Sequence, residues 1–313
     1  MVKFLSRLAA VSAILLMIII GMHVVTIRNM QSGVEKIYTL DPSTEVLFLG
    51  SSQVGCSIDE DEERLYHLRK LWVSETITPS FLIRLKELER RGQLDNLKTV
   101  VVPFNVNSVT CQSKKGYLWA WYLELPVAWR HMDLLPYGKL VLAWYMLCNQ
   151  RFPFRMLLEE FPPDRKPLAE RPDAYRKKVI SEFKKDALSC SGLADGQELQ
   201  ERLFDAYREM DEICRRHGIR FVIYKAPLLP AFERNFPTET QNRITAYEQR
   251  LCDMHIEYVK PQIELDERHF FDAVHLTMPG AKLFTAELFR LMDDAVVQKT
   301  PNPTTKQTKG KNE

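Results

Sequence analysis

The stretch Glu45-Val46-Leu47-Phe48-Leu49-Gly50-Ser51-Ser52 decides the fold class of this chain. Residues 45–49 form a short run of β-forming, mainly apolar side chains, which is typical of a strand that is buried on both faces. Gly50 lets the chain turn sharply after that strand, so that a following serine can project its hydroxyl from the edge of the sheet. The sequence therefore predicts a buried strand and, directly after it, a turn that carries polar side chains.

Apolar runs alternate with helical patterns along the rest of the chain. The pattern of residues 79–92, for example, places apolar side chains on one face of a helix and a glycine at its end. Strands that alternate with helices indicate a mostly parallel sheet, so the predicted fold class is α/β, a three-layer α/β/α sandwich. The predicted strands are residues 45–49, 99–102, 219–224 and 256–259, and residues 71–73 form a short apolar piece. The predicted helices are residues 59–68, 79–92, 172–190, 197–217, 239–254 and 279–292.

The amino-terminal residues have the pattern of a membrane anchor. Leu8–Ile27 contains no Lys, Arg, Asp or Glu, and at about 1.5 Å of rise per residue it would span about 30 Å, the thickness of the hydrocarbon core. A cleaved signal peptide has a shorter apolar stretch that ends at a small-x-small site. We therefore expect residues 1–28 to form an uncleaved signal anchor, a transmembrane helix, rather than a signal peptide or a buried core helix.

Positive charges lie on both sides of this segment. The amino-terminal amine, Lys3 and Arg7 precede it, whereas Arg28 and Lys36 follow it. Because positive charge favours the cytoplasmic side, the slight excess before the segment predicts a single-pass protein with a cytoplasmic amino terminus and an extracytoplasmic domain.

We divide the remaining chain into a stalk (29–43), a folded domain (44–297) and a disordered, Lys-rich tail (298–313). Within the domain, residues 113–165 hold most of the tryptophans, which predicts an aromatic-rich helical insertion. These side chains could stack on sugar rings, lie at a membrane interface, or only pack the insertion onto the core. The tryptophans of the insertion are Trp119, Trp121, Trp129 and Trp144.

The charge balance argues against nucleic acid as a partner. The net charge of the 313 residues is +2, and Lys3 and Arg7, which precede the domain, account for it. A domain whose charges balance has no general attraction for polyanions. The 6 cysteines include no Cys-x-x-Cys pair, which argues against a zinc ribbon or a thioredoxin-type site; they could form disulfides or be buried as small apolar residues.

Two groups of polar residues lie where open α/β sheets bind ligands, just beyond the carboxyl ends of strands. Gly50-Ser51-Ser52 follows the first strand, and backbone N–H groups at such a turn could hold an oxyanion. Asp272-Ala273-Val274-His275-Leu276-Thr277 precedes the last helix. An Asp three residues before a His can accept the Nδ1–H and leave Nε2 free as a base, although such a pair can also be a cap or a surface pair.

Together the two groups resemble the SGNH (GDSL-like) hydrolase family, and the resemblance covers roughly residues 44–292. The segment Phe270-Phe271-Asp272-Ala273-Val274-His275-Leu276-Thr277-Met278-Pro279-Gly280-Ala281 is similar to the last block of that family. Gly50-Ser51-Ser52 resembles its Gly-Asp-Ser block, with Ser51 in place of Asp. The resemblance implies that Ser52 is the nucleophile, His275 the base and Asp272 the residue that orients the base.

The family's oxyanion hole is matched less well. Asn105-Val106-Asn107-Ser108 is similar to a Gly-x-Asn-Asp block but lacks the Gly and the last Asp. The resemblance implies Asn107 as the oxyanion side chain, beside the backbone N–H of Ser52. The block that supplies a glycine has no match, and Ser74 is the nearest candidate.

The resemblance implies a membrane-anchored esterase or O-acyltransferase that acts on acyl esters. Extracytoplasmic glycans are the preferred substrates, a membrane-bound protein could supply the acyl group, and no cofactor or metal is expected. The alternative is a domain of the same fold that has lost catalysis and serves as a binding or assembly component of the cell envelope.

Two other enzyme classes fit the residues less well. The α/β-hydrolase fold requires Gly-x-Ser-x-Gly and separates Asp from His, whereas Val54 takes the second Gly position here. Asp59-Glu60-Asp61 could be the acidic metal motif of a glycosyltransferase, but it lies within the acidic run Asp59–Glu63, which is typical of a solvated helix start.

Overall fold

The structure is a computed structural model. It describes residues 38–59, 67–72, 78–105, 166–189 and 195–299, together with residues 4, 6, 7, 10–21, 24, 127, 130 and 131.

A five-stranded sheet forms the centre of the domain, in the order β2-β1-β3-β4-β5. In the described part of the chain every pairing between neighbouring strands is parallel, which confirms the predicted α/β class. The strands are β1 (Val46–Gly50), β2 (Leu68–Trp72), β3 (Thr99–Phe104), β4 (Arg220–Lys225) and β5 (Glu257–Val259).

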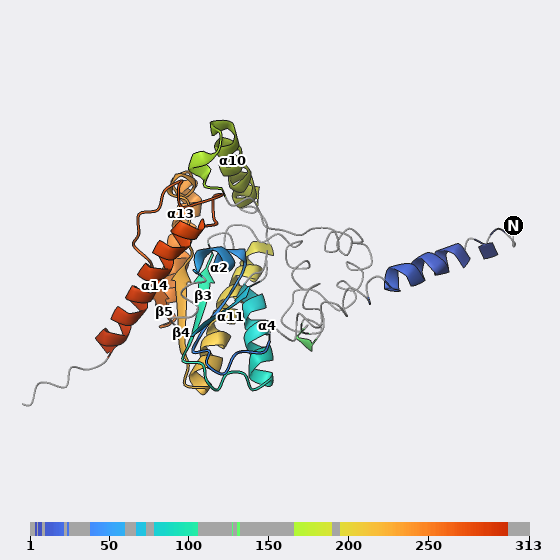
Figure 1. The fold of residues 1–313 in the computed structure, drawn as a ribbon, viewed down its shortest axis with the longest axis horizontal. Helices are drawn as coiled ribbons and strands as arrows, with labels where there is room; N and C mark the ends of the chain where they lie inside the picture. Colours follow the sequence, from blue (N-terminus) through green and yellow to red (C-terminus); the bar gives the residue numbers. More distant parts are fainter. Residues whose placement is uncertain are drawn as a thin grey trace, which may run out of the picture.

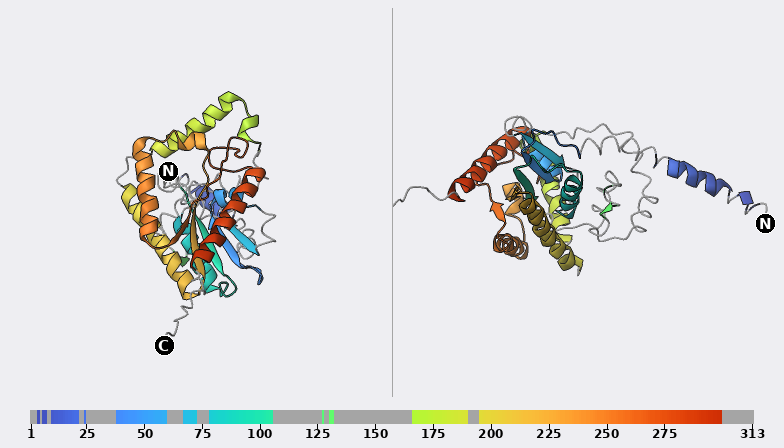
Figure 2. Two further views of the ribbon diagram at one scale, coloured as in Figure 1. Left: turned by 90° about the vertical axis from the view of Figure 1, so that its left-hand side faces the viewer. Right: turned by 90° about the horizontal axis from the view of Figure 1, so that it is seen from below.

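Helices cover both faces of this sheet (Figures 1 and 2). On one face α4 (Thr78–Arg90) packs against α11 (Asp195–Arg216), and α13 (Thr238–Asp253) lies beside the edge strand β5. On the other face α2 (Ser52–Ser57) packs against α14 (Met278–Lys299). Shorter elements are α12 (Pro230–Glu233) and the 3-10 turn η2 (Leu168–Glu170), and α10 (Asp173–Ser189) precedes α11 in the chain.

Aromatic side chains join the sheet to the helix that ends the domain. Phe48 of β1 contacts Tyr224 of β4 and Phe289 of α14 edge to face, with ring centroids 6.2 and 6.1 Å apart. All three rings are buried. Since the segments that carry the predicted site residues follow β1 and precede α14, this packing brings them to the same side of the domain.

The strand β3 extends two residues beyond the predicted end at Val102. It includes Pro103, which pairs with Tyr224 of β4 although proline has no N–H to donate. The pairing with β1 ends at Val101, so Pro103 lies where only one neighbouring strand remains. Its carbonyl accepts the Tyr207 hydroxyl of α11 at 2.9 Å.

The predicted stalk is shorter than expected, because its last residues belong to the domain. Tyr38 is fully buried, and the guanidinium of Arg91 lies 5.2 Å from the centroid of its ring. The Leu40 N–H donates to the Gln93 side chain at 2.9 Å. The domain therefore includes residue 38, not only the predicted range from residue 44.

Most of the aromatic insertion, including its tryptophans, lies outside the described residues. Arg130, which is described, donates to both carboxylate oxygens of Glu87 on α4, at 2.7 and 2.6 Å. Arg90 and Arg91 donate to the same carboxylate, which is completely buried. Burial alone would raise the pKa of Glu87, but the hydrogen bonds from the three arginines outweigh it and hold the pKa well below its usual range.

Several other predictions concern the ends of segments and single residues. The helix α14 runs to Lys299, past the expected start of the tail at residue 298. Asp59, predicted to be solvated, is buried and its N–H donates to the Thr285 hydroxyl at 2.9 Å. Of the cysteines, Cys56, Cys214 and Cys252 are described, and Cys214 and Cys252 are free thiols.

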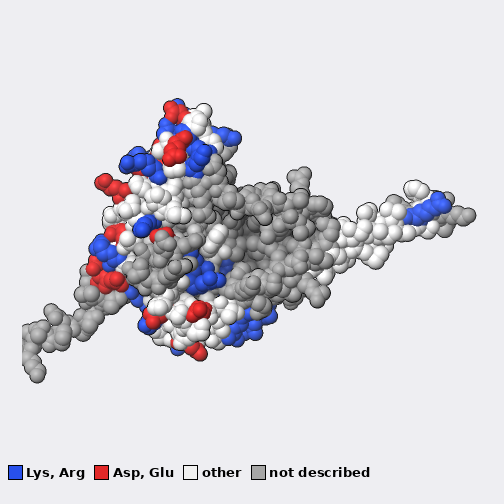
Figure 3. Space-filling model, viewed as in Figure 1, with Lys and Arg blue, Asp and Glu red and all other residues white. Residues whose placement is uncertain are grey.

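None of the described helices combines the length and the apolarity that crossing a membrane requires. Residues 10–21 are helical, and the rest of the predicted anchor is described only in part. On the face of the domain in Figure 3, acidic and basic side chains are interspersed.

Candidate active site

The turn after β1 buries Ser51 and leaves Ser52 half-buried. Ser51 caps α2, and its hydroxyl oxygen accepts the Gln53 N–H and the Asn105 side-chain amide, each at 3.4 Å. Ser52 is the first residue of the helix. Gly50 is required at this turn because an added Cβ would lie 2.1 Å from Cγ2 of Val54.

A loop before α14 holds Asp272 and His275 in a fixed arrangement. One carboxylate oxygen of Asp272, Oδ1, accepts the N–H groups of Val274 and His275 at 2.9 and 2.8 Å. The other oxygen, Oδ2, lies 2.7 Å from Nδ1 of His275. The carboxylate therefore orients both the backbone of its loop and the imidazole ring.

The two segments meet at the serine hydroxyl. Nε2 of His275 lies 2.8 Å from Oγ of Ser52, so Ser52, and not Ser51, contacts the imidazole. The predicted residues Ser52, His275 and Asp272 thus form one continuous chain of hydrogen bonds. With Nδ1–H donated to Asp272, Nε2 can accept the proton of the Ser52 hydroxyl.

The phenyl ring of Phe271 supports the imidazole from one side. It stacks on His275 with centroids 5.4 Å apart and planes inclined by 7°. The Phe271 N–H also donates to the His275 carbonyl at 3.1 Å. Side chains of Asp272 and His275 remain 20% and 18% exposed, so the hydroxyl can be reached from solvent without opening the core.

The predicted oxyanion residues are placed only in part. Asn107 and Ser74 lie outside the described residues. The N–H of Ser52 is at the start of α2, and within the described chain no hydrogen bond uses it. Sequence reasoning missed Asn105, which is buried and whose amide contacts Ser51; its place directly after β3, beside β1, was the available signal.

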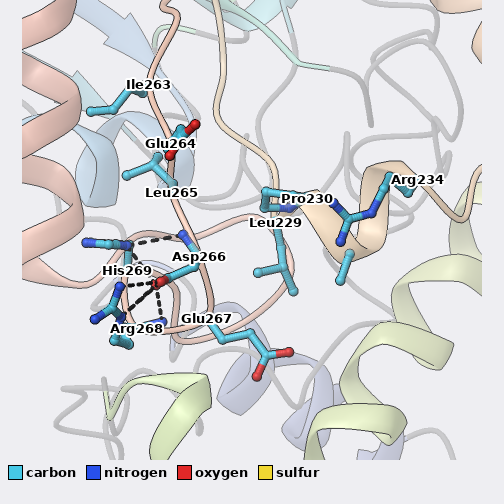
Figure 4. Close-up of a pocket in the computed structure, with 11 residues that line it drawn as sticks. Leu229, Pro230, Arg234, Ile263, Glu264, Leu265, Asp266, Glu267, Arg268 and His269 are labelled. Carbon is cyan, nitrogen blue, oxygen red and sulfur yellow. Dashed lines mark hydrogen bonds and ion pairs between the residues drawn. The ribbon is translucent and has the colours of Figure 1, made fainter.

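A pocket lies beside the loop that carries His275 (Figure 4). Its volume is about 580 Å³, and its walls are residues 229–231 and 234, after β4, and residues 263–269, after β5. The Leu229 N–H donates to the Ala273 carbonyl at 3.0 Å, which joins the pocket wall to the loop. Within the described residues the side chains of Arg234 and Glu264 have no ion-pair or hydrogen-bond partner.

Comparison with known proteins gives structural similarity without sequence similarity. No protein-family model and no curated protein matches the chain. A solved GDSL-like lipase from Bacteroides thetaiotaomicron is 12% identical with a TM-score of 0.39, over 87% of this chain and 98% of that one. A proposed acylhydrolase from Bacteroides fragilis is 12% identical with a TM-score of 0.37, over 82% and 87%. The structure of a proposed platelet activating factor from Streptococcus pneumonia is 11% identical with a TM-score of 0.41, over 89% and 98%.

At such identities and TM-scores, the function has to be argued from the geometry of this chain.

Proposed function

We propose that this protein is a serine esterase or O-acyltransferase in which Ser52 is the nucleophile. The observation that carries the proposal is the continuous arrangement of Oγ of Ser52, the imidazole of His275 and the carboxylate of Asp272, with distances of 2.8 and 2.7 Å. A serine hydroxyl is a weak nucleophile unless an adjacent base takes its proton, and this arrangement supplies that base.

In the first half-reaction Ser52 attacks the carbonyl carbon of an ester while His275 takes the hydroxyl proton. Asp272 stabilises the imidazolium that forms, and the imidazolium then donates its proton to the departing alkoxide. In the second half-reaction His275 deprotonates water or a sugar hydroxyl, which attacks the acyl carbon. The bond from that carbon to Oγ of Ser52 then breaks, and the imidazolium returns its proton to Oγ. Water as the attacking group gives an esterase, and a sugar hydroxyl gives an acyltransferase.

The tetrahedral intermediate needs hydrogen-bond donors for its oxyanion. We assign the Ser52 N–H to this role, because no hydrogen bond in the described chain uses it. Asn107, and more weakly Ser74, remain the proposed side-chain contributors on the basis of the family resemblance. The buried amide of Asn105 holds the neighbouring residue, Ser51, in place.

We further propose that the chain is anchored in a membrane by its amino-terminal segment, with the domain outside the cytoplasm. The consecutive residues Ile14–Ile18 are each 49–63% exposed. Consecutive residues point to all sides of a helix, so apolar side chains surround residues 10–21, and Figure 3 shows this segment almost free of charge. A helix that is apolar on every side needs an apolar environment.

For the substrate we propose acyl esters of extracytoplasmic glycans. The pocket in Figure 4 supports this proposal because its lining combines apolar residues with Arg234 and Glu264, whose polar groups are available to sugar hydroxyls. If the acyl group is transferred rather than hydrolysed, a membrane-bound partner would supply it.

Fluorophosphonate labelling of the purified full chain in detergent tests the proposed chemistry. We expect covalent labelling of the wild type, and its loss in Ser52→Ala and His275→Ala. Ser43→Ala is the matched control and should label normally, because Ser43 is exposed and within the described residues its hydroxyl bonds only Asp41. An unlabelled wild type would contradict the proposal and favour a binding or assembly role.

A further inference from the structure

We propose that Gln53 is a positioning residue that keeps His275 in place while Ser52 carries the acyl group. The inference rests on the proposed function and extends it to a residue outside the Ser52, His275 and Asp272 set. Its basis is one contact, in which Nε2 of Gln53 donates to the carbonyl of Val274 at 3.4 Å.

Gln53 is a buried polar residue, and its side-chain amide needs a hydrogen-bond partner. It is the second residue of α2, immediately after the nucleophile, and only 4% of it is exposed. Glutamine is rarely buried to this extent, because its amide loses water and must find a partner in the protein. The partner is the backbone of the loop that carries His275, 221 positions away in the chain.

The contact from Gln53 holds Val274, the residue directly before His275. The Val274 N–H is bound to Oδ1 of Asp272 at 2.9 Å, and the Val274 carbonyl is bound to Gln53. The peptide groups on both sides of Val274 donate their N–H to Asp272, and the second of them is also bound to α2 through its carbonyl. The bond from Gln53 therefore ties the loop to the nucleophile helix.

Within the described residues, only two hydrogen bonds join the first turn of α2 to residues 269–277. One is the contact of Gln53 with Val274, and the other is the contact of Ser52 with His275. The second is lost in the acyl-enzyme, because Oγ of Ser52 is then esterified and has no proton to donate. Gln53 thus provides the remaining hydrogen bond between the two segments, at the stage when His275 must activate water or the acceptor.

This reasoning predicts an asymmetric effect on the two half-reactions. Acylation begins with both hydrogen bonds between the first turn of α2 and the loop of His275 in place, whereas in the acyl-enzyme, within the described residues, only the bond from Gln53 remains between these two segments. A small displacement of a catalytic group can cost one to two orders of magnitude in rate. Removing the amide should therefore slow deacylation more than acylation.

The experiment uses p-nitrophenyl acetate with the full chain in detergent, and separates the initial burst from the steady state. In Gln53→Leu, which keeps the apolar stem and removes the donor, we expect deacylation to slow on the order of tenfold. The rate of fluorophosphonate labelling, which reports only the attack by Ser52, should change less than about threefold. The matched control is Gln241→Leu. Gln241 lies on α13, and the change removes its hydrogen bond to the Phe236 carbonyl (2.9 Å) and should leave both rates unchanged.

Gln53→Glu gives a second measurement in case Gln53→Leu folds poorly. A protonated Glu can donate to the Val274 carbonyl, whereas an ionised Glu repels it. The deacylation rate of Gln53→Glu relative to wild type should therefore rise as the pH falls.

Equal slowing of both half-reactions, or deacylation as fast as in Gln241→Leu, would overturn the positioning role while the proposed function stands. A wild type without burst and without labelling would overturn the proposed function itself, and the role of Gln53 with it.

Discussion

Ser52 and His275 lie 223 positions apart in the chain, and their side chains are joined by a contact of 2.8 Å between Oγ and Nε2. The serine follows β1 directly and the histidine lies in the loop before α14. The packing of α2 against α14 on one face of the sheet brings the two together. The proposed chemistry depends on this short distance between Oγ of Ser52 and Nε2 of His275.

Replacement of the Asp272 carboxylate should nearly abolish activity without unfolding the protein. In Asp272→Asn an oxygen can still accept the loop N–H groups, but the amide can donate to Nδ1 and favour the wrong tautomer of His275. We expect kcat to fall on the order of 10³- to 10⁴-fold. Asp205→Asn is the control, because Asp205 is an exposed aspartate on α11 that pairs with Arg208 away from the site. Equal losses in the two variants would contradict the assignment.

Alanine at Gly50 should disturb the nucleophile turn by a steric clash. The new Cβ would lie 2.1 Å from Cγ2 and 2.8 Å from Cβ of Val54. We expect Gly50→Ala to lose about 1–3 kcal/mol of unfolding free energy, the usual cost of overpacking, and most of its fluorophosphonate labelling. Adding Val54→Ala removes Cγ2 but keeps Cβ, so labelling should recover only in part. Full labelling of Gly50→Ala alone would show that the turn tolerates a side chain.

Glu87 should make stability depend on pH in the acidic range. Its folded pKa lies below that of an unfolded Glu, so its contribution is complete above the unfolded pKa, about 4.3, and is lost as the pH falls through the folded pKa. Glu87→Gln should weaken this acid dependence and lower the unfolding free energy at pH 7 by about 1–3 kcal/mol, because the arginines keep their charge but lose the buried carboxylate that compensates it.

Thermal unfolding between pH 3 and pH 7 measures the effect. Glu209→Gln is the control, since Glu209 pairs with Lys86 at the surface and should contribute less than about 1 kcal/mol. A flat pH profile in the wild type would contradict the assigned role of Glu87.

Cys252 is a native reporter of the side of the membrane on which the domain lies. It is an exposed, free thiol, whereas Cys214 is buried and burial raises its pKa to about 12. A membrane-impermeant maleimide should label the full chain in intact cells, and Cys252→Ser should label less than the wild type. Labelling of Cys252 only after the membrane is permeabilised would instead place the domain in the cytoplasm.

The strands were the most predictable part of the fold. The central strands β1, β3 and β4 are almost completely buried, so each is visible as a continuous apolar run. β1, β3 and β4 were therefore found to within one or two residues. The edge strand β2 is partly exposed, and its first residue, Leu68, was wrongly predicted to end a helix. The extension of β3 through Pro103 was missed, because only the sheet shows that β1 no longer pairs there. Likewise, the sequence does not indicate that Tyr38 belongs to the core, because its ring is covered by Arg91, which lies in a distant part of the chain.

By itself the sequence determined the local geometry of the site. Spacing of three residues lets a carboxylate reach the imidazole of the same loop, and a Gly-Ser-Ser turn after a strand presents a hydroxyl. Such local relations arise from backbone geometry and hold wherever the segments are placed. The chain, however, contains two Asp-x-x-His pairs, Asp266 with His269 and Asp272 with His275.

Only the tertiary structure brings the pair that the resemblance indicates, Asp272 with His275, to the serine. His275 contacts Ser52, whereas His269 lines the neighbouring pocket with Asp266. It likewise placed Gln53 against Val274. The physical reason is that such contacts join segments hundreds of residues apart, and their distances are set by the packing of helices on the sheet, which no short stretch of sequence contains.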